Sequence, residues 1–250
     1  YLELEDLLSI NYEFQNPLSK TTVEDQEEVE VAAEELRKQW DLGQDPIYSI
    51  ISLMEEHEIK IIEIDEDLSS FDGLSAFVGE KYPVIVINKN MPVERKRFTL
   101  LHELAHLLLS IPEDHAKQDR EKFCHRLAEA VLLPRAVVID QFGRNRNHIT
   151  FNELFSVQRH FGISVSAIIY RLYHNKVISQ EKQRRFFIQI NQDKSLKDQV
   201  NLERYNGDEA TDRYEKLVYR ALAQEQISTS KAAAMLGKSV EEIRDNFAVI

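Results

Sequence analysis

The chain has 250 residues, of which 31 are Lys or Arg and 43 are Asp or Glu, so its formal net charge is -12 with neutral histidines. This acidic excess disfavours a broad nucleic-acid-binding surface, which depends mainly on Lys and Arg. A single cysteine, Cys124, excludes an intramolecular disulfide framework, and no apolar run is long enough to span a bilayer. We therefore expect a cytoplasmic protein without a membrane partner.

Residues 1–22 precede the first clearly marked helix, and we expect them to form an N-terminal segment. The chain opens with Tyr1 rather than Met, which raises the expectation that a preceding domain is missing. Thr22 and Asp25 have the spacing that caps a helix over Val23–Lys38. Its many acidic residues indicate a solvated face rather than a binding patch.

Strands are expected after a second helix, which starts at Asp45-Pro46 and reaches Glu56. Three apolar segments have strand-like patterns: Ile59–Ile64, Leu74–Val78 and Val84–Ile87. Gly79–Pro83 joins the last two as a hairpin, so the sequence predicts a small antiparallel sheet. An edge strand of this sheet could hold an extended peptide, or the sheet could only cover the core; the pattern leaves both open.

The segment from Val93 to Ser110 predicts a largely buried helix, because it lacks Gly and Pro and carries apolar residues at helical spacing. It contains His102-Glu103-Leu-Ala-His106. Residues four apart share one helix face, so both imidazoles can reach one metal ion while Glu103 lies beside its water. This is the hydrolytic layout of a zinc peptidase. The alternative is a pair of core histidines bonded to backbone carbonyls.

A third ligand is expected on the next helix, because catalytic zinc takes three protein ligands and leaves one position for water. The segment Asp119–Leu133, which ends before Pro134, has helical spacing. Its candidate ligands lie on successive turns of one stripe: Glu121, His125 and Glu129. Cys124 lies among apolar positions and is interpreted as a small buried hydrophobe, with a redox role as the lesser alternative.

The segments Phe98–Leu109 (FTLLHELAHLLL) and Glu121–Pro134 (EKFCHRLAEAVLLP) resemble the ImmA/IrrE family of metallopeptidases. Segments before them, Asp72–Gly79 and Pro83–Asn88, resemble the family's strands, so the likeness runs from about residue 25 to 175. Two positions depart from the family pattern, because His125 stands where Asn is common and Leu127 where Phe is common. Neither position is a family ligand.

The resemblance implies a site with one Zn²⁺ per chain, with Mn²⁺ as an alternative. His102, His106 and Glu121 would be the metal ligands and Glu103 the general base. The sequence does not identify the residue that would stabilise the oxyanion together with Zn²⁺. Possible hydrogen-bond donors are Tyr82, His148, His160 and Tyr170. In this family an XRE-type helix-turn-helix often precedes a segment like residues 1–10, so the N-terminal segment is expected to be a remnant linker.

Beyond Pro134 the pattern is helical. Thr150–Glu153 forms a capping box, Gly162 ends that helix and Ser164 begins the next, which is the outline of a helix-turn-helix. A second helical pair is expected over Thr211–Gln226 and Ser228–Arg244. Its positive and negative residues balance, which does not indicate a DNA-binding face.

The expected fold class is therefore α+β and predominantly helical, with a small antiparallel sheet packed on the HExxH zinc-site helix and an all-helical C-terminal part. The expected domains are listed in chain order: an N-terminal segment (1–22), a zincin-like metallopeptidase domain (23–142), a helix-turn-helix-like extension (143–190), a loop or linker (191–210) and a C-terminal helical subdomain (211–250).

Two functions remain at this point. The first is a zinc endopeptidase that, as the resemblance implies, cleaves an XRE-type repressor to control prophage, mobile-element or stress-response genes. The second is a transcriptional regulator or antitoxin-like binding module with a non-catalytic peptidase fold. Glu103 favours the enzyme, because a structural zinc site needs no adjacent base. DNA would be contacted only indirectly or through the missing N-terminal domain, and the sequence sets no oligomeric state.

Overall fold

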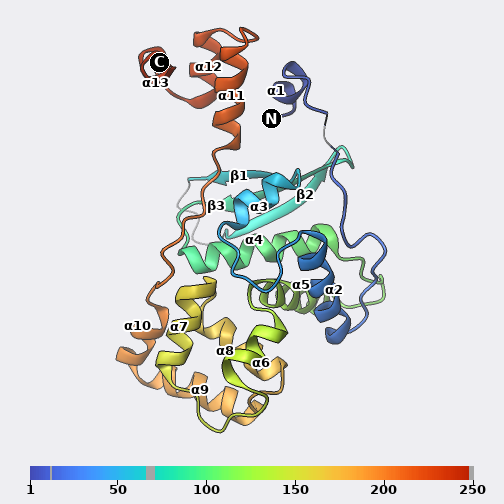
Figure 1. Cartoon of the computed structure of the whole chain (residues 1–250), viewed down its shortest axis with the longest axis vertical. Coiled ribbons are helices and arrows are strands. Elements are labelled where there is room, and N and C mark those ends of the chain that lie inside the picture. The colour runs from blue at the N-terminus through green and yellow to red at the C-terminus, as the bar shows by residue number, and fades with distance from the viewer. Residues whose placement is uncertain (12, 66–70, 248–250) are drawn as a thin grey trace.

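The computed structural model describes residues 1–11, 13–65 and 71–247 and has the expected α+β, predominantly helical fold. A small sheet lies between a layer of helices and a C-terminal helical subdomain (Figure 1). Within the described ranges, every helix is too short or too polar to cross a membrane. The elements are, in chain order, α1 (Leu2–Leu7), α2 (Gln26–Gln39), α3 (Ile50–Glu56), β1 (Lys60–Ile64), β2 (Gly73–Val78), β3 (Tyr82–Asn88), α4 (Val93–Leu108), α5 (Lys117–Leu132), α6 (Arg135–Phe142), α7 (Phe151–Phe161), α8 (Val165–His174), α9 (Gln180–Gln192), α10 (Lys194–Asn201), α11 (Arg213–Ala223), α12 (Thr229–Leu236) and α13 (Val240–Phe247).

The sheet has the strand order β1-β3-β2, in which β1 is parallel to β3 and β2 is antiparallel to β3. The expected hairpin of β2 and β3 is confirmed, but the expectation of a wholly antiparallel sheet is wrong. The chain forms β1 and β2 at the two edges and returns as β3 between them, so β1 and β2 are not neighbours. Ile61, Ile85 and Ser75 share one register row on the face that meets α4.

Helix α4 lies against the sheet and packs on α5, which in turn packs on α2 (Figure 1). The apolar residues of α4 and α5 that form this contact are fully or almost fully buried: Leu100, Leu101, Leu104, Leu108, Phe123, Leu127 and Val131. Burying one such side chain stabilises the fold by roughly 1.5 to 3 kcal/mol. Apolar burial therefore sets the distance between α4 and α5, the two helices that carry the candidate ligands.

The expected ends of α7 are confirmed, since Thr150 and Glu153 form its capping box and Gly162 ends it in the left-handed conformation. Three other expectations are wrong. The helix expected from Val23, with Thr22 as its cap, begins only at Gln26, and Asp25 is the cap. The helix expected from Asp45-Pro46 begins only at Ile50, and the loop expected over 191–210 contains α10. In α10 the side chain of Asp193 accepts a hydrogen bond from Leu196 N, so local capping offsets a polar sequence.

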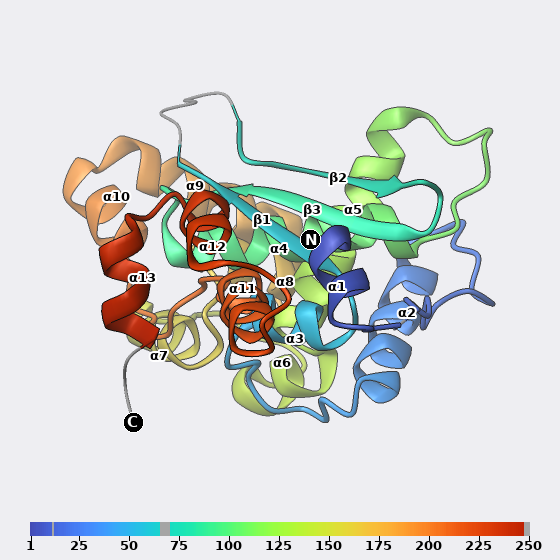
Figure 2. The same ribbon diagram turned by 90° about the horizontal axis from the view of Figure 1, so that it is seen from above.

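A second, smaller core lies on the other side of the sheet (Figure 2). It joins α1 to the C-terminal helices through their buried apolar residues, which include Leu4, Leu8, Val218, Ala221, Ala232 and Ile243. A buried ion pair between Lys60 and Glu5, with Nζ and Oε1 3.0 Å apart, attaches α1 to β1. The first residues therefore pack in the C-terminal subdomain, whereas the expectation was a linker. The expected domain boundaries stay predictions.

Residues 202–211, which we call the strap, connect α10 to α11 along α4 and α3. Glu209 of the strap is buried and forms an ion pair with Arg97 of α4. Its carboxylate also accepts hydrogen bonds from the backbone N–H groups of Ile50 and Ile51, at 2.9 and 3.0 Å. The arginine in turn donates to the backbone oxygen of Ile47 at 2.7 Å. One ion pair thus joins α4, the start of α3 and the strap.

Gly162 is required beside this ion pair for two reasons. Its φ of +62° favours glycine, and a Cβ atom there would lie 2.5 Å from Nε of Arg97. The backbone oxygen of Gly162 accepts a hydrogen bond from that nitrogen at 3.2 Å. The turn between α7 and α8 therefore closes directly on the arginine.

We predict that Arg97→Met lowers the free energy of unfolding by about 3 to 5 kcal/mol, because it leaves the buried Glu209 carboxylate without its cation. Urea unfolding followed by circular dichroism measures the change. Arg185→Met is the matched control, since Arg185 forms an exposed pair with Glu181 and should change stability by less than about 1 kcal/mol. Equal effects of the two substitutions would show that the Arg97 pair is not a stabilising contact.

Candidate metal centre

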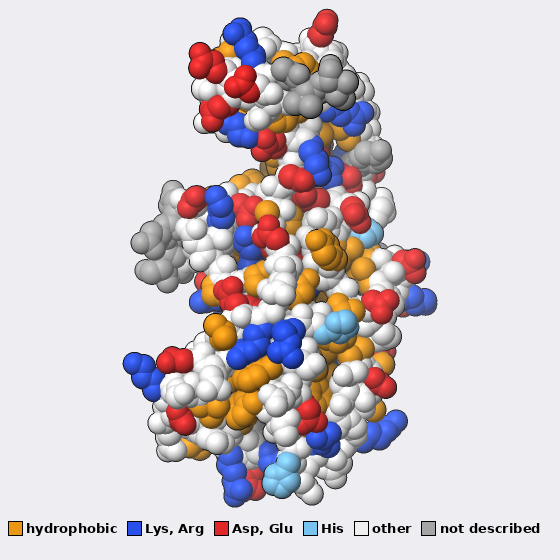
Figure 3. All heavy atoms as spheres, turned by 60° about the vertical axis from the view of Figure 1, so that its left-hand side comes forward, with side chains coloured by type: hydrophobic (Ala, Val, Ile, Leu, Met, Phe, Trp, Pro, Cys, Tyr) orange, Lys and Arg blue, Asp and Glu red, His pale blue; other side chains and the backbone are white. Residues whose placement is uncertain are grey.

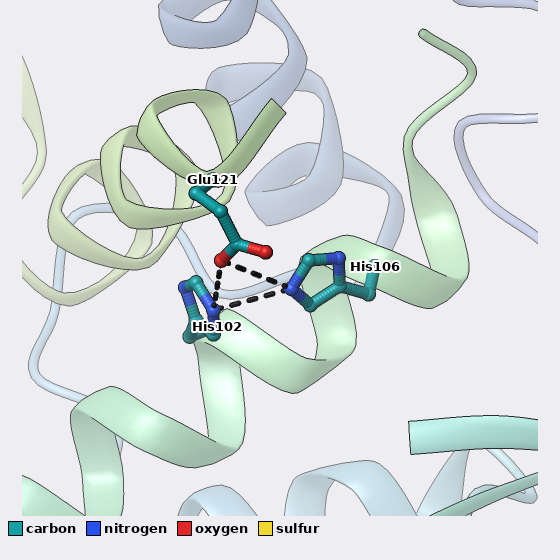
Figure 4. Close-up of side chains that lie close together, drawn as sticks. All are labelled: His102, His106 and Glu121. Atoms are coloured by element: carbon teal, nitrogen blue, oxygen red, sulfur yellow. Dashed lines mark hydrogen bonds and ion pairs between the residues drawn. The ribbon is translucent and has the colours of Figure 1, made fainter. Parts of the chain in front are cut away.

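Three predicted ligands meet between α4 and α5 (Figure 4). His102 and His106 lie one turn apart on α4, and Glu121 extends from α5 toward both rings. The two Nε2 atoms are 3.2 Å apart, and Oε2 of Glu121 lies 3.3 Å from Nε2 of His102 and 3.7 Å from Nε2 of His106. The three ligand atoms therefore form a nearly equilateral triangle.

This triangle has the dimensions of one face of a zinc coordination tetrahedron. Zinc–nitrogen and zinc–oxygen bonds of about 2.1 Å place tetrahedral ligands about 3.4 Å apart. Two imidazoles and one carboxylate are also a known ligand set of hydrolytic zinc, and this set leaves the fourth position open. The residues therefore fit a zinc ion without rearrangement of the backbone.

The electrostatics of His102 favour metal binding. Burial lowers the pKa of His102 to about 4, and the neighbouring His125 and His106 shift it in the same direction. The ring is therefore neutral at physiological pH, which is the form that binds metal. Within the described chain, Nδ1 of His102 is buried and has no hydrogen-bond partner. A proton on Nδ1 would leave Nε2 free as the ligand atom.

Cys124 lies behind His106, with Sγ 3.4 Å from Nδ1 of that ring. Burial raises the pKa of the thiol to about 12, and the nearby carboxylates of Glu121 and Glu103 act in the same direction. The expectation of a buried small residue is correct, but the contact with His106 was missed. Its position three residues after Glu121, on the same face of α5, is the sequence signal for it.

The other two candidate ligands lie outside the triangle. Among the described residues, the group close enough to hold a metal ion contains only His102, His106 and Glu121. His125 is exposed, and its ring centroid lies 4.5 Å from that of His102. Glu129 is buried, and one of its oxygens lies 3.0 Å from Nδ1 of His174. Glu129 is thus engaged by His174 of α8.

Glu103, the candidate base, is buried between α4 and β2. The hydroxyl of Ser75 donates a hydrogen bond to Oε2 of Glu103 at 2.7 Å. Gly73 on the same strand permits this close approach, because a Cβ atom there would lie 3.3 Å from Cγ of Glu103. Sequence reasoning missed Ser75. Its position between Leu74 and Ala76 indicates that Ser75 points to the other face of the strand than these two residues, but not which side chain it contacts.

Of the possible oxyanion donors, three lie away from the three ligands. Tyr82 lies on the face of the sheet opposite to Ser75, where its ring is near Nζ of Lys60. His148 is exposed on the loop before α7, and His160 lines a separate surface cavity beside Arg159. Tyr170, on α8, lines a cavity that also contains His125.

Comparison with known proteins finds one matching protein family. Residues 54–173, just under half of the chain, match the Peptidase_M78 family model, the IrrE N-terminal-like domain. The match confirms the resemblance drawn from the two motifs. No curated protein matches the chain significantly.

Among solved structures, a transcriptional regulator from Mycobacterium tuberculosis is 13% identical, with a TM-score of 0.40. The match covers 68% of this chain and 50% of that one. The chain thus spans about half the length of this regulator.

We predict that protein prepared without chelator contains close to one zinc per chain, as measured by inductively coupled plasma mass spectrometry. Glu121→Gln should weaken zinc binding by about 100-fold or more, because it removes a charged ligand. His125→Asn is the matched control and should retain the metal, since His125 lies outside the triangle. Loss of zinc in His125→Asn with retention in Glu121→Gln would reverse the ligand assignment.

Proposed function

We propose that the chain is a zinc-dependent metalloendopeptidase of the cytoplasm that cleaves a DNA-binding repressor, and so controls prophage, mobile-element or stress-response genes. The observation that best supports this is the buried carboxylate of Glu103. It lies beside His102 in the sequence and is held by Ser75 rather than by a cation. A structural zinc site needs no such group, whereas hydrolysis requires a base.

The proposed chemistry divides between the metal and this carboxylate. Zinc, when bound, lowers the pKa of water and polarises a peptide carbonyl. Because Ser75 occupies Oε2, the proton transfers fall to Oε1 of Glu103. This oxygen takes a proton from the attacking water as the new carbon–oxygen bond forms. It then gives the proton to the amine as the carbon–nitrogen bond breaks, so one carboxylate serves as base and acid.

The outer edge of β2 is the proposed peptide-binding wall. In the strand order β1-β3-β2 this strand is at the edge, and its residue Ser75 contacts the catalytic base. Leu74, Phe77 and Val78 are each more than two-fifths exposed, so the strand offers apolar contacts as well as backbone groups. An extended substrate that adds to this edge would pass beside Glu103.

A protein substrate fits the charge distribution better than direct DNA contact. Figure 3 shows positive and negative side chains interspersed on the visible face of the C-terminal subdomain. Its lysines are paired with carboxylates: Lys216 with Asp212, Lys231 with Glu3 and Lys238 with Glu215. An XRE-type repressor is the proposed substrate, and DNA would be affected through it.

We predict that Glu103→Gln retains zinc but lowers cleavage of the repressor encoded nearby in the genome by at least about 100-fold, because the amide cannot accept the proton. Ser75→Ala should lower the rate by about tenfold, since it only frees the carboxylate to move. Gel-based cleavage of purified repressor and metal analysis of each variant are the measurements.

The same experiment separates the two functions considered. A regulator or antitoxin-like module with the peptidase fold would bind the repressor without cutting it, and Glu103→Gln would leave that binding unchanged. Tyr219→Phe, on α11 in the second core, is the control for nonspecific effects. Zinc-loaded protein that binds the repressor and leaves it intact would contradict the proposed peptidase.

A further inference from the structure

A cavity of about 760 Å³ lies between α5 and α8, next to the candidate metal site. Phe98 of α4, one helical turn before His102, belongs to its wall together with His125 of α5. The ring of His125 is stacked on Phe98, with centroids 5.8 Å apart, and its centroid lies 4.5 Å from that of His102. One aromatic ring therefore separates the cavity from the first of the three ligands.

The lining of this cavity is mainly apolar and opens to solvent. Its apolar surface comes from α4 and α8, through Phe98, Ala167, Tyr170 and Tyr173. Tyr170 is 43% exposed, and its ring lies 5.3 Å from that of Phe187 on α9, centroid to centroid. The mouth of the cavity therefore has an aromatic rim. Its volume is in the range of pockets that bind small organic groups.

The charged side chains of the lining do not favour a charged occupant, because each is paired with another residue. The pairs are Lys122 with Asp119 at 2.7 Å, Arg126 with Glu30 at 2.9 Å and Glu129 with His174 at 3.0 Å. A charged group that entered the cavity would lose water without gaining a free partner of opposite charge among these residues. A neutral, apolar group loses nothing of this kind and gains contact with the aromatic wall.

We propose that this cavity binds a large apolar side chain of the peptide substrate, aromatic or branched aliphatic, close to the scissile bond. The assignment to a substrate rests on the proposed function, because a peptide that crosses the candidate metal site would bring a side chain to the adjoining cavity. A side chain held there would also fix the position of the neighbouring peptide bond. The cavity would in this way determine which bond is cut. A free apolar molecule is the other occupant to be distinguished.

The first experiment tests the cavity without proteolysis. The probe is N-acetylphenylalaninamide, and N-acetylalaninamide is the comparison; both are neutral, so the protein is used as purified. Titration followed by NMR chemical shifts gives the two dissociation constants. We expect the phenylalanine probe to bind at least about tenfold more tightly, because burial of a whole aromatic side chain is worth at least this factor. N-acetyllysinamide, which is long but charged, should bind no more tightly than the alanine probe.

Two variants locate this binding. Ala167→Trp fills the cavity from α8 and should abolish the preference for phenylalanine, whereas Ala234→Trp adds the same side chain at an exposed position of α12 and should retain it. Tyr170→Ala removes part of the exposed rim, so it covers the case in which Ala167→Trp fails to fold. It should weaken the phenylalanine probe at least about threefold. Tyr48→Ala is its control, since Tyr48 is 83% exposed and lies outside the cavity.

Two results of this experiment would overturn the proposal. The first is equal binding of the phenylalanine and alanine probes by the wild type. The second is a preference for phenylalanine that Ala167→Trp and Tyr170→Ala both leave unchanged, because the probe would then bind elsewhere.

The second experiment tests the assignment to a substrate. Once a cleaved repressor peptide is available, its residues near the scissile bond are replaced one at a time by alanine. Replacement of one large apolar residue should lower kcat/KM at least about tenfold in the wild type and by less than about twofold in Ala167→Trp. If no such residue matters, the peptidase stands and the assignment is overturned, which leaves a free apolar molecule as the occupant. A protein that binds the probe but cuts nothing would instead contradict the peptidase and, with it, the assignment to a substrate.

Discussion

Helix α4 imposes the main constraint on this structure, because it is buried and yet carries a charged or polar side chain on every turn. The charged groups among them are each contacted by a different, distant part of the chain. Glu94 accepts from Gln158, Lys96 pairs with Glu63, and Arg97 pairs with Glu209. Farther along, Ser75 holds Glu103, and Glu121 faces the two histidines. Much of the fold is therefore arranged so that the polar side chains of one buried helix have partners.

The position of α5 depends on a second buried charge cluster. Glu30 of α2 binds Arg171 of α8 and Arg126 of α5, so one carboxylate joins three helices. Since α5 also carries Glu121, this cluster and the apolar α4–α5 contact together set the third corner of the ligand triangle. The candidate metal site is thus supported from both sides, by the sheet next to Glu103 and by the helices behind Glu121.

What could be predicted from the sequence was local. Helical spacing identified α4 and α5, and the i, i+4 relation placed His102 and His106 on one face. Capping residues located the ends of α7 and the start of α8. Contacts across long sequence separations were not predictable in this way. No periodicity shows that Ser75 meets Glu103, that Glu209 lies under Arg97, or that β3 inserts between β1 and β2. Glu121 itself was selected only by the family resemblance, because spacing alone did not separate it from His125 and Glu129.

The reciprocal contacts of α4 have an evolutionary consequence. A substitution at Arg97 strands the carboxylate of Glu209, and a side chain at position 162 collides with the guanidinium. Arg97 and Gly162 are therefore not free to change independently of their surroundings. Relatives that lack Arg97 are expected to lack Glu209 as well. The same is expected of Ser75 and Glu103 for a different reason, since there the shared constraint is the proposed role of Glu103 as base rather than the stability of the fold. Covariation across a family would separate these two kinds of constraint.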